Sequence, residues 1–188
     1  MEARQPEDTE LVELAKDGDV NAFEGLVLRH QGVAYRVAWL VTRHGAEAED
    51  AVQEAFVKAY LALPRFRRGA PFRPWLLRIV TNEARNRARS GRRREGLAMR
   101  ATATGDREPA PSPETAALAR EDAEALMRAL DRLREADRLV VAYRYLLELS
   151  ESETAEALEI RPGTVKSRLS RAIARLRAEL ERTGEVDR

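Results

Sequence analysis

The chain has 188 residues, of which 33 are basic, 32 acidic and 44% apolar, and its formal net charge is +1. This composition excludes a chain disordered throughout, and the length suits one domain or two small ones. It has no cysteine, which excludes disulfides, and His30 and His44 lie too far apart in sequence for a metal pair. No apolar stretch approaches the roughly 20 residues of a membrane span, and the acidic N-terminus has no signal-peptide core. These features predict a cytoplasmic protein that does not insert into a membrane.

The near-zero sum of charges hides an uneven distribution along the chain. Net charges of −6, +10, −2, −5 and +4 belong to residues 1–64, 65–94, 95–116, 117–159 and 160–188. A block as basic as 65–94 favours a polyanion as ligand over an ordinary solvated surface. Arg makes up 30 of the 33 basic residues, which suits contacts to phosphate and guanine. A GC-rich coding sequence is the simpler cause of the Arg excess.

Apolar residues at helical spacing predict four helices in the first 94 residues. Their stripes cover about 11–15, 21–41, 48–63 and 72–80. Asn21 and Glu24 have the spacing of a capping box at the start of the second helix. Pro64 ends the third helix, and Pro71 and Pro74 stand near the first turn of the fourth.

Residues 95–114 are rich in Gly, Pro, Ala and Thr and carry no apolar stripe, which predicts a flexible linker. Helical stripes then return over about 119–133, 139–146, 151–158 and 163–182. No alternating strand pattern occurs. The sequence predicts an all-α protein with two small helical domains, 1–94 and 117–188, joined by a linker over 95–116.

The last two predicted helices form a helix-turn-helix. Ser150 and Glu153 fit a capping box at the start of the first, whose residues Ala155 and Leu158 face inward. The buried stripe of the second helix is Val165, Leu169, Ile173, Leu176 and Leu180, and its opposite face carries Lys166, Ser167, Arg168, Ser170, Arg171 and Arg175. A basic, hydroxyl-bearing face in this position suits base edges and phosphates in a DNA major groove. An ordinary helical hairpin with a solvated face fits the pattern too.

The fourth predicted helix of the first domain has a second polar face. It carries Arg78, Asn82, Arg85, Asn86 and Arg89. Asn amides read base edges, and Arg binds phosphates or stacks on bases. The loop before this helix combines Phe66 with Arg67 and Arg68, a mixture that suits unstacked single-stranded bases. Phe72 and Trp75 lie on the apolar stripe and are expected in the core, and Phe66 is open to either role.

An acidic patch lies on the helix predicted over 48–63. Asp50, Gln53 and Glu54 fall on one side of it. The helix dipole favours acidic residues near a helix start, which is one explanation. A basic surface of a partner protein is the other.

Four stretches in order resemble bacterial RNA polymerase sigma factors of the sigma-70 family, in the compact extracytoplasmic-function (ECF) group. Ala48–Tyr60 resembles region 2.2, which binds the β′ clamp helices of the polymerase. Phe72–Asn86 resembles regions 2.3 and 2.4, which melt and read the −10 element. Tyr143–Ala155 resembles the scaffold of region 4, and Gly163–Ala172 resembles its −35 recognition helix.

The resemblance implies a sigma factor that binds core RNA polymerase at the β′ clamp helices and the β flap and directs promoter-specific transcription initiation. It assigns polymerase contacts to Asp50, Gln53 and Glu54. It assigns the −35 element to Lys166, Ser167, Arg168, Ser170 and Arg171. It assigns the −10 element to Arg78, Asn82, Arg85 and Asn86, with the loop that contains Phe66 and Arg67 holding a flipped base. It further implies control by an anti-sigma factor.

The turn before the predicted recognition helix departs from the family pattern Leu-Gly-Ile-Pro. Here Glu159 stands in place of the Gly, and Pro162 is shifted by one place. Glu in a left-handed conformation at a helix end costs on the order of 1 kcal/mol relative to Gly.

Two other classes of protein remain as alternatives. A helix-turn-helix transcriptional regulator that does not bind core polymerase would share the second domain but not the acidic patch. An enzyme has almost no support, because no nucleophile motif, phosphate-binding loop or metal constellation occurs, and we expect no cofactor or metal.

Overall fold

A computed structural model describes residues 6–98 and 128–182, with side chains described for 6–91 and 128–182. Within these ranges every regular element is helical and no strand occurs. The chain divides into two compact units, Met1–Gly105 and Asp106–Arg188. The predicted all-α class with two helical domains is therefore confirmed. Most of the segment expected as a linker, 99–116, lies outside the described residues.

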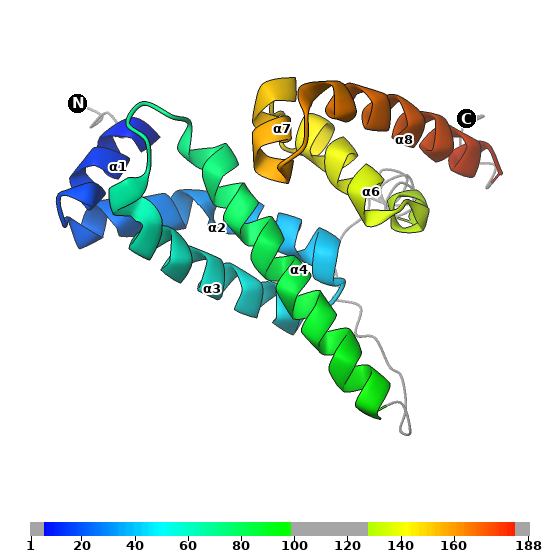
Figure 1. Cartoon of the computed structure of the whole chain (residues 1–188), viewed down its shortest axis with the longest axis horizontal. Helices are drawn as coiled ribbons and strands as arrows, with labels where there is room; N and C mark the ends of the chain where they lie inside the picture. Colours follow the sequence, from blue (N-terminus) through cyan, green and yellow to red (C-terminus); the bar gives the residue numbers. More distant parts are fainter. Residues whose placement is uncertain (1–5, 99–127, 183–188) are drawn as a thin grey trace, which may run out of the picture. The chain divides into compact units, whose positions relative to one another are not determined.

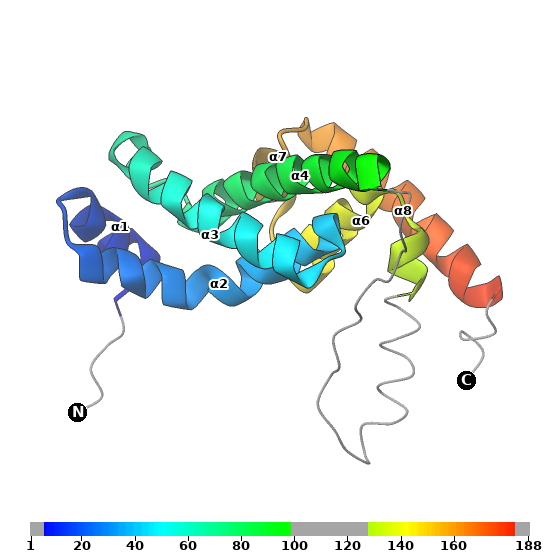
Figure 2. The same cartoon turned by 90° about the horizontal axis from the view of Figure 1, so that it is seen from below.

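The first unit is built from helices that pack on one another. They are α1 (Asp8–Lys16), α2 (Val20–Thr42), α3 (Gly45–Ala62), the 3₁₀ turn η1 (Leu63–Arg65) and α4 (Phe72–Ala98). The three long helices α2, α3 and α4 contact one another pairwise, with α4 crossing the other two (Figure 1). The short helix α1 packs against the start of α2 and against η1, at one end of the bundle (Figure 2).

Small side chains bring the three long helices close together. Fully buried alanines line their contacts at 34, 38, 48, 51, 55, 59 and 84. Larger residues such as Leu26, Leu76 and Leu77 fill the remaining space. The predicted core residues Phe72 and Trp75 are buried, with 3% and 8% of their surface exposed.

The start of α2 differs from the predicted capping box. The side chain of Asp19, not Asn21, caps the helix, because its Oδ1 accepts hydrogen bonds from the backbone N–H groups of Asn21 and Ala22 at 2.9 and 3.2 Å. Both residue types are good caps, and Asp19 follows Gly18, whose φ of 99° turns the chain out of α1. The predicted capping box at Asn21 is therefore wrong, and the N-cap lies two residues earlier.

The fourth helix is longer than its apolar stripe indicates. It continues from Phe72 to Ala98, four residues past position 94, the predicted end of the first domain. At the end of the preceding helix, α3 stops at Ala62 and Pro64 lies in η1, as Pro64 predicts.

The second unit consists of helical residues 128–132, α6 (Glu135–Val141), the π-helical turn η2 (Ala142–Leu146), α7 (Glu151–Leu158) and α8 (Pro162–Arg182). The long helix α8 packs against α6 and α7. Leu130, Leu133, Val141 and Ala172 form a core cluster, and Leu169 and Leu176 pack against it. Of the predicted stripe, Val165 is fully buried, and the fully buried Ala172 belongs to the same face although the stripe omitted it. The predicted helix over 119–133 lies outside the described residues up to position 127.

The helix-turn-helix has the predicted local structure. Ser150 and Glu153 form the capping box, with Ser150 Oγ accepting from the Glu153 N–H at 3.2 Å and Glu153 Oε2 from the Ser150 N–H at 2.8 Å. Glu159 ends α7 in the left-handed region, at φ 54° and ψ 43°. Pro162 is the first residue of α8, a position that proline favours. Ala155 and Leu158 are buried as expected.

No helix within residues 6–98 and 128–182 is both long and apolar enough to cross a bilayer.

Candidate nucleic-acid interface

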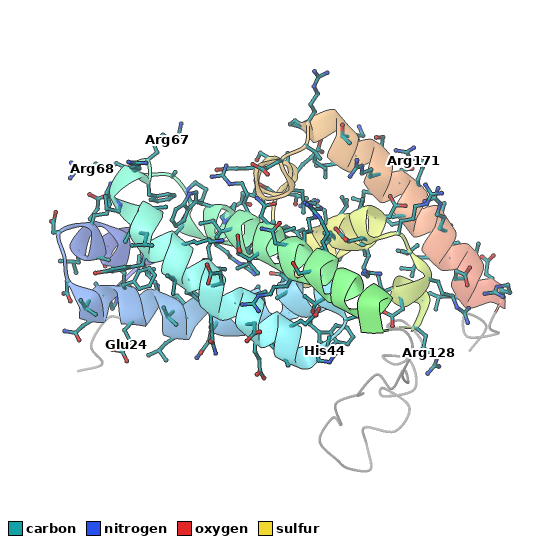
Figure 3. All side chains as sticks on the ribbon, turned by 60° about the horizontal axis from the view of Figure 1, so that its bottom comes forward. Glu24, His44, Arg67, Arg68, Arg128 and Arg171 are labelled. Carbon is teal, nitrogen blue, oxygen red and sulfur yellow. The ribbon has the colours of Figure 1, made fainter. Side chains whose placement is uncertain are left out.

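The first turns of α8 present the residues predicted to contact duplex DNA. Lys166, Ser167, Ser170 and Arg171 are exposed, and Arg168 is partly buried. Two of these side chains are held on the helix itself, since Ser167 Oγ donates to the Thr164 carbonyl at 3.2 Å and Arg171 Nε donates to the Ser167 carbonyl at 3.1 Å. Figure 3 shows Arg171 on the outer side of α8. The arrangement gives an exposed, positively charged face that can meet phosphates and base edges.

Arg175, on the same predicted face, has a different environment. Its Nη1 forms a short ion pair with the carboxylate of Asp137 on α6. Asp137 is buried, with 8% of its surface exposed. This ion pair ties α8 to α6, and no sequence pattern indicates it because the two residues are 38 positions apart.

The polar face of α4 follows the predicted spacing. Asn86 and Arg89 are exposed, and Arg78, Asn82 and Arg85 are partly buried. The core side of the same helix contains Leu76, Val80 and Ala84, so these polar residues lie around the remaining surface. The side chains of 92–94, the predicted arginine run, lie outside the described residues.

The loop between η1 and α4 turns tightly. Gly69 takes a φ of 71°, a left-handed conformation, and the Ala70 N–H donates to the Arg67 carbonyl at 3.2 Å. Arg67 and Arg68 are exposed, and Arg67 points away from the helices (Figure 3). Arg68 Nε lies 2.9 Å from Glu13 Oε2 on α1, so the loop offers the guanidinium group of Arg67 to a ligand.

Phe66 belongs to the core in this structure. Only 7% of its surface is exposed, and its ring packs against Trp75 and Phe72 with centroid distances of 4.7 and 6.1 Å. A buried ring has no free face for a base, so Phe66 can contribute to base binding only by anchoring the loop to the core.

The acidic patch on α3 carries its own counter-charges. Arg87 Nη1 lies 2.8 Å from Asp50 Oδ2, and Lys58 Nζ lies 2.7 Å from Glu83 Oε2 and 3.5 Å from Glu54 Oε1. The hydrogen bond with Glu83 raises the pKa of Lys58 above its ordinary value. Gln53 is exposed on the same helix. The patch is thus part of a network of ion pairs between α3 and α4. Only the Glu54–Lys58 pair, at i to i+4 spacing, can be recognised from the sequence.

His30 joins the start of α1 to α2. Its Nε2 lies 2.7 Å from Asp8 Oδ2, and Arg29 Nη1 donates to Asp8 Oδ1 at 2.6 Å. The hydrogen bond with His30, and then that with Arg29, hold the pKa of Asp8 below its ordinary value against the opposing effect of burial. His30 is 5% exposed, and its ring lies against Phe72 at a centroid distance of 5.4 Å. We assign the cluster a structural role.

Comparison with known proteins identifies the class. The family model of Sigma-70 region 2 matches residues 26–94, and that of Sigma-70, region 4 matches residues 123–176. The chain belongs to the sigma-70 family of RNA polymerase sigma factors, and the two matches fall on its two helical units.

Curated relatives place it in the ECF group of that family. It is 36% identical over 179 residues to the ECF RNA polymerase sigma-E factor of Escherichia coli (strain K12), covering 90% of this chain and 92% of the relative. It is 36% identical over 178 residues to the RNA polymerase sigma-H factor of Pseudomonas aeruginosa, covering 89% of this chain and 91% of the relative.

Two solved structures share the fold. CnrH, solved in complex with the cytosolic domain of CnrY, aligns with a TM-score of 0.70 at 28% identity, over 93% of this chain and 97% of CnrH. The sigma factor RpoE from Bartonella quintana, solved with the anti-sigma factor NepR, aligns with a TM-score of 0.72 at 25% identity, over 90% of this chain and all of RpoE.

Proposed function

We propose that this sigma factor binds core RNA polymerase through α3, reads the −35 element with α8, and melts and reads the −10 element with α4 and the loop before it. The first domain, 1–94, serves polymerase and the −10 element, the second, 117–188, serves the −35 element, and 95–116 connects them. The observation that carries the proposal is the presence of one basic helix face in each of two units of a sigma-70 family chain.

The second domain is suited to duplex DNA. The exposed residues at the start of α8 are Lys166, Ser167, Ser170 and Arg171, where a recognition helix contacts base edges. Arg168 lies partly buried beside them and adds a phosphate contact. The short helix α7 and the turn at Glu159 set the angle at which α8 leaves the core.

The first domain is suited to separated strands. Asn82 and Asn86 supply amides that hydrogen bond to base edges, and Arg78 and Arg85 supply charge for phosphates. Arg67 in the adjacent loop is exposed and can contact a flipped base. The buried ring of Phe66 anchors this loop to the core.

The patch of Asp50, Gln53 and Glu54 is the proposed polymerase contact. Asp50 and Gln53 are exposed, and the ion pairs of Asp50 and Glu54 with Arg87 and Lys58 hold their carboxylates in fixed positions. A basic helix of a partner can bind such a prearranged acidic surface.

An anti-sigma factor is the expected regulator. CnrH and the Bartonella quintana RpoE were each solved with a bound protein, which for RpoE is the anti-sigma factor NepR. By this likeness we expect a dedicated partner that competes with core polymerase for this chain.

Transcription in vitro tests the proposal. Core polymerase lacking any sigma factor is mixed with the purified chain and a library of promoter fragments, and the transcripts are sequenced. We expect initiation at templates that share two spaced elements. Absence of any transcript above that of core polymerase alone contradicts the proposal.

A variant of the acidic patch distinguishes a sigma factor from the alternative. The alternative is a helix-turn-helix regulator that does not bind core polymerase. Asp50→Ala with Glu54→Ala is expected to abolish binding to core polymerase while DNA binding by the second domain is retained. Glu49→Ala, at an exposed position of α3 outside the patch, is the matched control and is expected to leave binding to core polymerase unchanged. Normal binding of the double variant to core polymerase contradicts the assignment of the patch.

A further inference from the structure

The N-terminal helix α1 contacts the loop before α4 directly. Lys16 Nζ donates a hydrogen bond to the backbone carbonyl of Phe66 at 3.0 Å. The Lys16 side chain is only 13% exposed, and Phe66 closes η1 by donating its own N–H to the Leu63 carbonyl at 2.9 Å. Both polar groups of the Phe66 backbone are therefore occupied, and the second contact comes from a residue 50 positions earlier in the chain.

A second contact reaches the middle of the same loop. Glu13, one turn before Lys16 on α1, lies 2.9 Å from Arg68 Nε through its Oε2. Its other oxygen lies 3.7 Å from Lys16 Nζ. Glu13 thus links the two loop contacts into one group. Arg68 is 80% exposed, so this pair steers the side chain without burying it.

The far end of the loop is held by the start of α1. Asp8 contacts His30 at 2.7 Å, and the ring of His30 packs against Phe72, the first residue of α4. Phe72 in turn packs against Phe66 at the opposite end of the loop. Both ends of the loop are consequently fastened by contacts that begin on α1.

We propose that α1 is a brace that fixes the loop before DNA binds, and that Lys16 and Glu13 are positioning residues for base selection at the −10 element. The inference rests on the proposed function, in which Arg67 of this loop contacts a flipped base. Gly69 gives the loop conformational freedom that must be restricted when a base is bound. A loop restricted beforehand selects its base better, because less order has to be created on binding.

The test measures base preference with the full chain bound to core polymerase. The probes are a single-stranded −10 oligonucleotide of the sequence preferred by the wild type and its single-base variants. Arg67→Ala first identifies the base position that the loop reads. Lys16→Ala is expected to reduce preference at that same position about tenfold, the size expected when a hydrogen bond to a charged group is removed. Glu13→Gln is expected to have a smaller effect there.

Further measurements separate positioning from unfolding. Lys16→Arg retains a donor and is expected to restore most of the preference. Asp17→Ala, an exposed neighbour on the same helix end, is the control and is expected to leave the preference unchanged. The affinities for core polymerase and for a −35 duplex, and the melting temperature of the chain, are expected to stay within about twofold and a few degrees of the wild type.

Three outcomes overturn the inference. If Lys16→Ala leaves the base preference unchanged at the position identified with Arg67→Ala, α1 does not position the loop, while the proposed function stands. An equal fall in affinity for every oligonucleotide makes Lys16 a general stability or charge contact. If the wild-type complex shows no base preference, the proposed function fails first and the brace with it.

Discussion

Glu159 occupies a backbone conformation that glycine adopts at lower cost. Its φ of 54° ends α7 and directs the chain into α8. A side chain with Cβ in this region is strained relative to Gly, and that strain lies within the turn between α7 and α8.

Glu159→Gly is therefore expected to stabilise the protein, by about 0.5–1 kcal/mol in the free energy of unfolding. Urea unfolding followed by circular dichroism measures it. Glu156→Gly, at an exposed position inside α7, is the control and is expected to destabilise by about 1 kcal/mol. Destabilisation by Glu159→Gly would show that the Glu159 side chain adds more to the free energy of unfolding than the backbone strain subtracts from it.

The environment of Asp8 predicts that the free energy of unfolding depends on pH. Its pKa is lowered in the folded state, first by the hydrogen bond with His30, so the folded state favours the carboxylate. The resulting stabilisation is complete above the ordinary aspartate pKa of about 4 and disappears as the pH falls through the lower folded value.

Urea unfolding of the wild type and of Asp8→Asn from pH 7 to pH 3 measures this contribution. The stability difference between the two proteins is expected to shrink as the pH falls below about 4. A difference that does not change over this range would contradict the assigned role of the Asp8 carboxylate.

At the scale of elements, α8 is held on α6 by the Asp137–Arg175 ion pair in addition to apolar contacts. Asp137 is buried and Arg175 is about half exposed, so the pair is only partly screened by water. A double-mutant cycle with Asp137→Asn and Arg175→Gln is expected to give a coupling energy of about 1 kcal/mol.

The pair of Arg132 and Glu179 joins residues 128–132 to α8 at 2.8 Å in a more exposed position and is the comparison. Its coupling is expected to be smaller than that of Asp137 and Arg175. Equal coupling in the two cycles would show that burial of Asp137 adds nothing.

Local signals predicted most elements, and contacts distant in sequence escaped prediction. The Ser150–Glu153 box and the stop at Pro64 depend on neighbouring residues alone, and both are observed. The Asp50–Arg87 and Lys16–Phe66 contacts join residues 37 and 50 positions apart, for which one sequence carries no pattern.

In the candidate site too, features that depend on local sequence were predicted, and features that depend on distant contacts were not. The exposure of Lys166 and Arg171 follows from the apolar stripe on the other side of α8. The burial of Phe66 and the pairing of Arg175 depend on which helix packs opposite them. The sequence alone therefore does not predict the environment of the loop or of Arg175 on α8.

For the whole molecule, near-neutral net charge conceals a polyanion-binding protein, because acidic and basic segments cancel. The affinity of the holoenzyme for promoter DNA is therefore expected to fall steeply with salt. Arg168→Ala is expected to lower the slope of log affinity against log salt concentration by about one, because its side chain is the proposed phosphate contact. Arg177→Ala, farther along α8, is the control. An unchanged slope for Arg168→Ala would contradict that phosphate contact.

We propose that one chain reads two promoter elements with two separate helix faces. Transcription from a promoter library with core polymerase tests this proposal when two variants are compared with the wild type. Lys166→Ala with Arg171→Ala is expected to relax base preference only in the −35 element, and Asn82→Ala with Asn86→Ala only in the −10 element. The discrimination should fall by about 1–3 kcal/mol for each side chain that reads a base edge. Relaxed base preference in the same element with both variants, or in neither element with either variant, would contradict separate reading of the two elements.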